Sequence, residues 1–401
     1  MFQFDPSKRI LDHESHDQFD GVNPSITDSS TFAFRSPETM EELFDHEIEG
    51  CFLYSRHWNP TNKHLATGLA ALEDTESAQV TASGMGAISC ALLQLCQQGD
   101  QILASRTIYG GTYALLKNFL PRFGITTRFV DITDVDVVAR ALNDNVKVIF
   151  CESIANPLLH VADIKTLREL ADRVGAKLVV DNTFSPLVIT PVHLGAHVVI
   201  HSLTKFINGH SDCVAGAVCG TDEFVHQLTD INMGAGMLLG PVLDSFRSAS
   251  ILKNLHTLHI RMQKHSANAA FLADKLNALG LPTHYPGLKE HPQHELMKAQ
   301  MNEDFGFGGI LTLDAGDHIS ANRLMLLMQQ RKVGFLAVSL GYFRTLFSAP
   351  GSSTSSEIPK DEQAEMGLSG GLVRMSVGLD QNIEETYDVL VGCLRDVGIV
   401  R

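Results

Sequence analysis

A lysine in a polar turn, Lys205, is the residue of this sequence whose surroundings most favour chemistry. It lies in the segment His201–Asp212, directly after the apolar run Ala196–Ile200, which predicts a buried strand that ends in a polar turn. The hydroxyl residues Ser202 and Thr204 flank it. Partial burial there would lower the pKa of the ammonium and free a nucleophilic nitrogen, as a Schiff-base lysine requires. Taken alone, a lysine in a polar loop is more often a surface group.

Two carboxylates are also expected at strand ends. The apolar runs 146–151 and 176–180 are followed directly by Glu152 and Asp181. Helical patterns alternate with these runs, which predicts an α/β fold with a mostly parallel sheet covered by helices. Ligands of such sheets collect outside the carboxyl ends of the strands, and a buried carboxylate is costly unless it meets a cation. The sequence therefore predicts a site where Glu152, Asp181 and Lys205 converge.

Two other segments are suited to anions. Residues 83–86 read Ser-Gly-Met-Gly between a short strand and an apolar helix, where backbone N–H groups and a helix N-terminus form an anion pocket. Glycines also serve tight strand–helix turns without any ligand. Upstream, Tyr54 and Arg56 precede an Asn-Pro pair and can both reach one anion, although a turn with an incidental arginine is the alternative.

Composition limits the classes of function. The chain has 401 residues, is 44% hydrophobic and carries a net charge of −15, which argues against nucleic acid or an anionic membrane as the main partner. No run approaches the length of a membrane span, and the N-terminal segment has no apolar signal core. The seven cysteines favour a reducing cytoplasm. His291 and His294 do not amount to a metal site, because two such histidines are more often hydrogen-bonded groups.

The chain divides into three expected parts. Residues 1–57 form an irregular arm with one helix that begins at Pro37, residues 58–256 form the large domain, and residues 257–401 form a smaller α+β domain. A long helical pattern over 255–279 opens the last part. Its predicted strand 371–378 carries an arginine, Arg374, between apolar neighbours. Such an arginine usually pairs with a carboxylate, either structural or from a substrate.

Several motifs together resemble the Cys/Met-metabolism enzymes that use pyridoxal phosphate. That family includes cystathionine synthases and lyases, methionine gamma-lyases and O-acylhomoserine sulfhydrylases. The resemblance is collinear from about residue 32 to residue 380. The motifs are Tyr-Ser-Arg-x-x-Asn-Pro-Thr from Tyr54, Ser-Gly-Met-Gly-Ala from Ser83, Tyr-Gly-Gly-Thr-Tyr from Tyr109, Glu-Ser-x-x-Asn-Pro from Glu152, Val-Asp-Asn-Thr-Phe from Val180, His-Ser-x-Thr-Lys from His201 and Val-Arg-Met-Ser-Val-Gly from Val373.

The resemblance implies fold type I and a role for each matching residue. Lys205 would form the Schiff base with pyridoxal 5'-phosphate, and Asp181 would pair with the ring nitrogen and keep it protonated. Tyr109 would stack on the ring and help proton transfer, while Asn156 would contact the ring hydroxyl. Arg374 would bind the substrate carboxylate. Ser83, Gly84, Met85, Ser202 and Thr204 would surround the phosphate, and Ser339 would lie beside the substrate carboxylate. The resemblance also implies a homotetramer built as a dimer of dimers. In it Tyr54 and Arg56 would reach the site of the neighbouring subunit, with Tyr54 also near the substrate.

The sequence departs from the family pattern at positions expected to face the substrate. Gly111 stands where methionine gamma-lyases usually carry cysteine, and Arg344 replaces an acid in the segment Ser339–Leu346, next to Tyr342-Phe343. If Arg344 reaches the pocket, it repels a second ammonium such as that of cystathionine. The other departures are Trp58, Lys253-Asn254 and Thr354-Ser355.

We therefore predict a carbon–sulfur lyase that acts on a methionine-like amino acid by gamma-elimination and releases a 2-oxo acid, ammonia and a thiol. An O-acylhomoserine sulfhydrylase or a cystathionine gamma-synthase, which both work by gamma-substitution, stays open, as does a cystathionine lyase. An aminotransferase of the same fold type and a non-catalytic relative are further alternatives from other classes.

Overall fold

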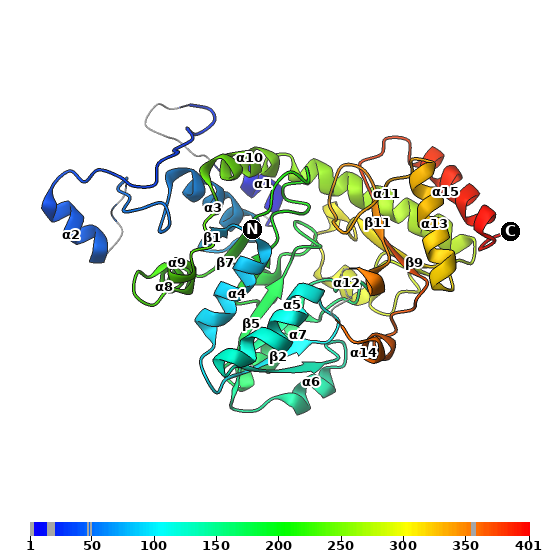
Figure 1. Cartoon of the computed structure of the whole chain (residues 1–401), viewed down its shortest axis with the longest axis horizontal. Coiled ribbons are helices and arrows are strands. Elements are labelled where there is room, and N and C mark those ends of the chain that lie inside the picture. Colours follow the sequence, from blue (N-terminus) through cyan, green and yellow to red (C-terminus); the bar gives the residue numbers. More distant parts are fainter. Residues whose placement is uncertain (1–3, 14–20, 46–47, 49, 354–357) are drawn as a thin grey trace.

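A seven-stranded sheet is the centre of the computed structural model, which describes residues 4–13, 21–45, 48, 50–353 and 358–401 (Figure 1). Its strand order is β1-β7-β6-β5-β4-β2-β3, and β7 alone runs antiparallel to its neighbours. The predicted mostly parallel sheet is confirmed. The strands are β1 (Ser77–Thr81), β2 (Gln101–Ser105), β3 (Thr126–Val130), β4 (Val146–Glu152), β5 (Lys177–Asp181), β6 (Val198–His201) and β7 (Gly216–Gly220).

Helices cover both faces of this sheet. Successive strand residues point to opposite sides, and both sides carry apolar side chains that pack against helices. On one face, Ile149 and Val180 pack in a core with residues of α3 (Pro60–Glu73) and α7 (Ile164–Arg173). On the other, Phe150 and Val179 pack with residues of α4 (Gly84–Leu95). The shorter elements here are α5 (Gly110–Ala114), α6 (Val135–Ala141), α8 (Asp222–Thr229) and α9 (Ala235–Leu239).

The register of the parallel strands brings the predicted polar residues to one height. Glu152 of β4 pairs with Asp181 of β5, and Asp181 pairs in turn with Ile200 of β6. Lys205 follows β6 by four residues. The two carboxylates and the lysine turn therefore lie at the same edge of the sheet.

The N-terminal segment packs on this body at its start and then extends away from it, with its second helix at the far left of Figure 1. It contains α1 (Pro6–Leu11), which the sequence did not predict, and α2 (Pro37–Asp45), which begins at the expected proline. Ser36 Oγ accepts a 3.2 Å hydrogen bond from Thr39 N, as expected of an N-cap.

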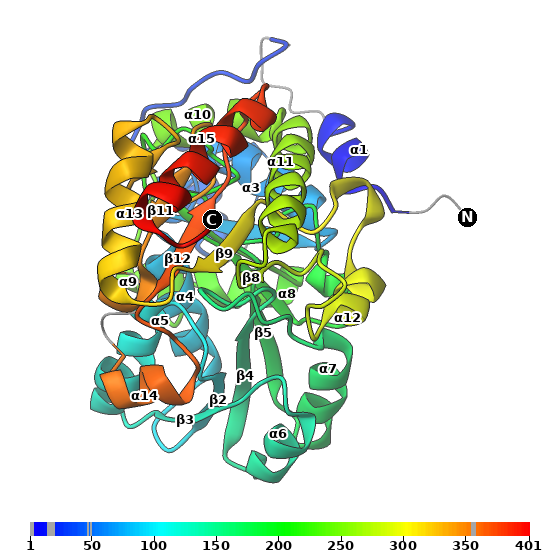
Figure 2. The same ribbon diagram turned by 90° about the vertical axis from the view of Figure 1, so that its right-hand side faces the viewer.

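A second sheet forms the C-terminal part and lies to the right in Figure 1. Its order is β10-β11-β12-β9-β8. Helices α11, α13 and α15 lie over one face of it, towards the viewer in Figure 2. The elements are α11 (Leu258–Ala278), β8 (Thr283–His284), α12 (His294–Gln300), β9 (Ile310–Asp314), α13 (His318–Gln330), β10 (Phe335–Leu336), β11 (Leu346–Ser348), α14 (Lys360–Glu365), β12 (Leu372–Ser376) and α15 (Ile383–Val397).

The single helix predicted over 255–279 is wrong at its start. One helix, α10 (Ser245–Leu255), ends at Leu255, and α11 begins at Leu258. Thr257 between them has φ −106° and ψ 6°, which is outside helical geometry. The expected domain boundary at residue 256 falls at this break, and the boundaries at 57 and 256 stay a prediction. None of the helices in the described parts of the chain combines the length and apolarity of a bilayer span.

Candidate active site

A pocket of about 260 Å³ lies at the carboxyl ends of the central strands. It is formed by the ends of β4, β5 and β6, the start of α4, and the strand β12 of the second sheet together with the segment that follows β10. Most of the predicted site residues meet here. They are Ser83, Gly84, Met85, Tyr109, Glu152, Asn156, Asp181, Ser202, Thr204, Lys205 and Arg374.

Lys205 is the reactive candidate because its amine is mostly withdrawn from water. Burial lowers its pKa to about 8, and the positive charge of Arg374 acts in the same direction. Its Nζ donates a 3.0 Å hydrogen bond to Ser339 Oγ. The backbone of the second part packs tightly on this turn, since a Cβ on Gly341 would lie 2.5 Å from Phe206 N. A side chain at position 341 would therefore displace the lysine turn.

Asp181 is held from one side only. Its Oδ1 accepts hydrogen bonds from Thr183 N at 3.0 Å and from Thr183 Oγ1 at 2.5 Å. Burial raises its pKa, and the Thr183 hydrogen bonds and the neighbouring His201 oppose that rise. The other carboxylate oxygen makes no hydrogen bond to the described residues. Thr183 lines the pocket, although it was not among the predicted site residues.

Glu152 organises the opposite wall. Its two carboxylate oxygens accept hydrogen bonds from Tyr109 N at 2.8 Å and from Asn156 N at 2.7 Å. Burial and the nearby Asp181 raise its pKa to about 8, against the effect of these hydrogen bonds and of Arg374. This carboxylate was expected to meet a cation. The structure adds that it fixes the backbone at two other predicted site residues.

Arg374 is 2% exposed, and its guanidinium lines the pocket with a hydrogen-bond donor that the described residues leave unused. It donates to Asn156 Oδ1 at 2.8 Å and to Ser339 O at 3.3 Å. Its Nε is buried without a hydrogen-bond partner among the described residues. An unpaired buried donor is costly, so a carboxylate brought here by a ligand would be stabilised. Asn156 therefore orients Arg374, in addition to any contact that Asn156 makes with a ligand.

The start of α4 forms the anion-binding end of the pocket. Ser83 Oγ caps the helix by accepting a 2.9 Å hydrogen bond from Gly86 N. A Cβ on Gly84 would lie 2.8 Å from Ser202 Cβ, so glycine lets the two backbones approach here. The N–H groups at this N-terminus and the nearby Ser202 and Thr204 suit a phosphate group.

The departures from the family pattern do not remake the pocket wall as predicted. Arg344 lies with its guanidinium 4.7 Å from the centre of the Phe335 ring and donates to Lys332 O at 3.3 Å. Tyr342 and Phe343 pack on each other, with ring centroids 4.4 Å apart. None of these residues lines the pocket, where Val338 and Leu340 stand instead. Arg344 therefore does not repel a second ammonium from the pocket, and that prediction is wrong.

The remaining departures have structural positions of their own. A Cβ on Gly111 would lie 2.5 Å from Tyr109 Cε1, so the glycine makes room for the Tyr109 ring. Trp58 is buried, and Lys63 Nζ lies 4.2 Å from the centre of its ring. Asn254 Nδ2 donates to Asn208 Oδ1 at 2.8 Å, beyond the lysine turn. Thr354-Ser355 lies outside the described residues.

Three other predicted residues lie outside the pocket lining. Ser339 borders it through its contact with Lys205. Tyr54 and Arg56 lie against each other, with the Arg56 guanidinium carbon 5.7 Å from the centre of the Tyr54 ring. Their expected role across a subunit interface stays a prediction. No cluster of His, Cys, Asp or Glu that could hold a metal occurs in the described part of the chain, and His294 Nδ1 lies 2.9 Å from Pro286 O.

A buried amine of low pKa, a carboxylate on the next strand and a phosphate-sized anion site are what pyridoxal phosphate needs from a protein. The two-sheet α/β architecture around them is that of fold type I pyridoxal-phosphate enzymes, and this prediction of the fold class is confirmed. The family model of the Cys/Met metabolism PLP-dependent enzymes matches residues 8–391, and the chain belongs to this family.

Relatives and solved structures narrow the comparison. The chain is 46% identical over 373 residues to methionine gamma-lyase of Arabidopsis thaliana, covering 92% of this chain and 85% of that one. It is 30% identical to the structure of cystathionine gamma synthase from Xanthomonas oryzae pv. oryzae, with TM-score 0.88 and 99% of each chain covered. An O-acetylhomoserine (thiol)-lyase structure from Campylobacter jejuni, so described, is 27% identical with TM-score 0.90, covers 98% of this chain and 100% of its own, and contains N'-pyridoxyl-lysine-5'-monophosphate. The prediction of a pyridoxal-phosphate-dependent lyase near the methionine gamma-lyases is confirmed.

Proposed function

We propose that the protein cleaves a methionine-like amino acid by gamma-elimination, with release of a thiol, ammonia and a 2-oxo acid. The observation that carries the choice of substrate is the apolar side of the pocket. Val338, Leu340, Phe184 and Val214 line it, and its two acidic groups already serve the cofactor end. A neutral thioether suits such a wall, whereas the distal ammonium and carboxylate of cystathionine would lose water there without a partner.

The cofactor we propose is pyridoxal 5'-phosphate, joined to Lys205 Nζ. Asp181 would face its ring nitrogen, and the start of α4 with Ser202 and Thr204 would bind its phosphate. When bound, pyridoxal phosphate supplies a ring that withdraws electrons from the carbon next to the substrate amine.

The protein's own groups position the substrate and move protons. Arg374 binds the substrate carboxylate, because its buried Nε has no partner among the described residues and its other nitrogens are already fixed by Asn156 and Ser339. The Lys205 amine, neutral above about pH 8, takes up the proton from the α carbon. Tyr109, whose backbone N–H donates to Glu152, would give a proton to the leaving thiolate.

Subunit assembly and location belong to the same proposal. Tyr54 and Arg56 are not among the residues that line this pocket, so we propose that they complete the site of a neighbouring copy in a dimer, and that two dimers form a homotetramer. A cytoplasmic location agrees with the seven free cysteines. Sedimentation of a fully active monomer would contradict the shared site.

The test is a side-by-side assay of the purified protein with pyridoxal phosphate. Methionine, cystathionine, cysteine and O-acylhomoserines with a thiol are compared by kcat/KM, with detection of oxo acid, thiol and new thioether. We expect methionine to give the highest value among the elimination substrates. A preference for O-acylhomoserine with thiol, and new thioether as product, would instead establish gamma-substitution; a preference for cystathionine would contradict the argument from the apolar wall.

A further inference from the structure

A buried carboxylate–imidazole pair lies behind the pocket, among residues that do not line it. Glu73 is the last residue of α3 and His201 the last residue of β6, and both side chains are 1% exposed. Glu73 Oε1 lies 2.6 Å from His201 Nε2. The proposed reaction gives neither residue a role. Burial of such a pair costs free energy because both groups lose their contacts with water.

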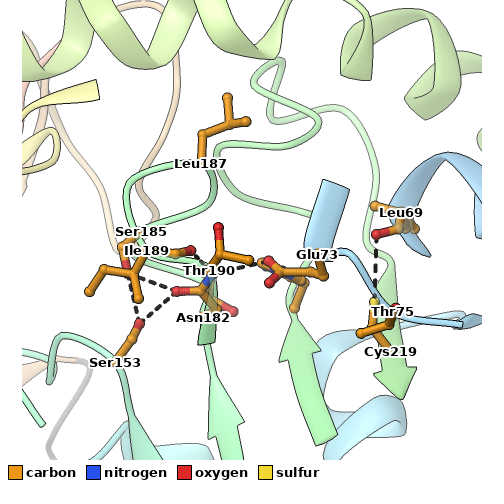
Figure 3. A network of polar contacts seen from close by, with 12 residues as sticks. Leu69, Glu73, Thr75, Ser153, Asn182, Ser185, Leu187, Ile189, Thr190 and Cys219 are labelled. Atoms are coloured by element: carbon orange, nitrogen blue, oxygen red, sulfur yellow. Dashed lines mark hydrogen bonds and ion pairs between the residues drawn. The ribbon is translucent and has the colours of Figure 1, made fainter. Parts of the chain in front are cut away.

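The pair joins the two strand ends that present the site. Glu73 Oε1 also accepts a 3.0 Å hydrogen bond from Asn182 Nδ2, and Asn182 directly follows Asp181. Figure 3 shows Glu73 reaching from its helix to Asn182. One carboxylate oxygen therefore bridges the end of β5, which presents Asp181, and the end of β6, which leads to the Lys205 turn.

A second bridge crosses the same two strand ends on the pocket side. Thr183 Oγ1 accepts from Ser202 N at 2.8 Å and donates to Asp181 Oδ1 at 2.5 Å. Asp181 is thus held directly by a hydroxyl that lines the pocket, while the buried pair behind it holds the adjacent Asn182. Removal of either bridge would leave the orientation of the Asp181 carboxylate toward a ligand less restricted.

The pair also lies close to the buried carboxylate of Asp181. Glu73, Glu152 and Asp181 are all buried at or beneath this edge. His201 is close enough to Asp181 for its positive charge to lower the pKa of that carboxyl, in opposition to burial. Glu73 holds the His201 ring through the contact between Oε1 and Nε2, so the position of the ring relative to Asp181 depends on Glu73, although the two carboxylates do not touch.

We propose that Glu73 and His201 are positioning residues for Asp181: together they fix the ends of β5 and β6 and hold the His201 imidazole behind the carboxylate that faces the cofactor ring nitrogen. This inference rests on the proposed function only through the cofactor, and not through the substrate.

The test compares two ligands of the apoprotein, pyridoxal phosphate and its analogue with a carbon atom in place of the ring nitrogen. Only the first can form the charge-assisted contact with Asp181. We expect Glu73→Gln to raise the Kd of pyridoxal phosphate about tenfold, a typical effect of losing one supporting interaction behind a binding group, and to change the Kd of the analogue less than about twofold. His201→Gln should reproduce this pattern.

The matched control is Ser185→Ala. Ser185 Oγ donates to Asn182 Oδ1 at 2.9 Å in the same network, without touching Glu73 or His201 (Figure 3). Because it removes a hydrogen bond to Asn182 but leaves the contact between Glu73 and His201 intact, it should change the two Kd values by the same factor. Glu73→Asp, which keeps the charge, should recover part of the difference between the ligands.

Two results would overturn the inference. One is an equal weakening of both ligands by Glu73→Gln, which would make the pair a structural element only. The other is a wild-type protein that binds the two ligands equally, since Asp181 would then have no contact to support. Failure to cleave methionine, with the two Kd values as expected, would contradict the proposed substrate and leave this inference standing.

Discussion

Replacement of Arg374 by lysine tests the proposed binding of the substrate carboxylate. Arg374 reaches Asn156 and Ser339 with two nitrogens and leaves a buried Nε without a partner among the described residues. Lysine keeps the positive charge near Glu152, so the fold is expected to survive, but it has no planar fork. At least one charge-assisted hydrogen bond to the substrate is lost.

The size of the effect follows from that count. A hydrogen bond to a charged group contributes about 1.5–3 kcal/mol, so the KM for methionine is expected to rise about 10- to 150-fold in Arg374→Lys. The kcat should fall less, because Lys205 and Asp181 are unchanged. Steady-state kinetics with saturating pyridoxal phosphate give both constants, and thermal unfolding shows whether the variant is folded.

Arg344→Lys is the control for this experiment. Arg344 lies over Phe335 outside the pocket, so its KM should stay within about twofold of wild type, as expected for a surface substitution. A KM for Arg374→Lys that stays near the wild-type value, or an equal rise in both variants, would refute the assignment of the carboxylate site.

Three further outcomes are expected. The rate at which the apoprotein captures pyridoxal phosphate should rise with pH and reach half its maximum near pH 8, because burial lowers the pKa of Lys205 to about 8 and only the neutral amine reacts. Stopped-flow absorbance measures this rate, and a rate that still rises beyond pH 10 would contradict the lowered pKa. Glu152→Gln should lower the free energy of unfolding by about 1–3 kcal/mol, because an amide nitrogen replaces one of the two oxygens that accept from the backbone N–H groups of Tyr109 and Asn156. Denaturant unfolding of the apoprotein measures this change, and an unchanged midpoint would refute the prediction. Asp181→Asn should keep the fold and bound cofactor but lose most turnover, because an amide cannot keep the ring nitrogen protonated; near-normal kcat would show that Asp181 has another role.

The edge of the sheet that carries the site could be predicted from the sequence. Apolar runs that end at Glu152, Asp181 and the Lys205 turn predict parallel strands, and the register of such strands places their ends together. The helix start at Pro37 could be predicted as well, since proline and the preceding serine are local signals. Each of these predictions depends on neighbours in the sequence.

What could not be predicted depends on contacts between distant residues or on the path of one turn. His201 and Glu73 are 128 residues apart, and no local pattern indicates that they form a buried pair. Arg344 was expected near the pocket because it follows Ser339 closely. The positive φ of 77° at Gly341 turns the chain between them, and the arginine packs on Phe335 instead. The side chains that do reach the pocket, Val338 and Leu340, are ordinary apolar residues without a motif.

The most direct test of the account is chemical trapping of Lys205 in protein that turns over methionine. The holoenzyme is assayed for thiol and 2-oxo acid, treated with borohydride, digested and mapped by mass spectrometry. We expect the pyridoxyl group on Lys205 alone, with activity lost in proportion to the fraction of Lys205 modified. A pyridoxyl group on another lysine, or full methionine turnover after Lys205 has been modified, would contradict the central claim.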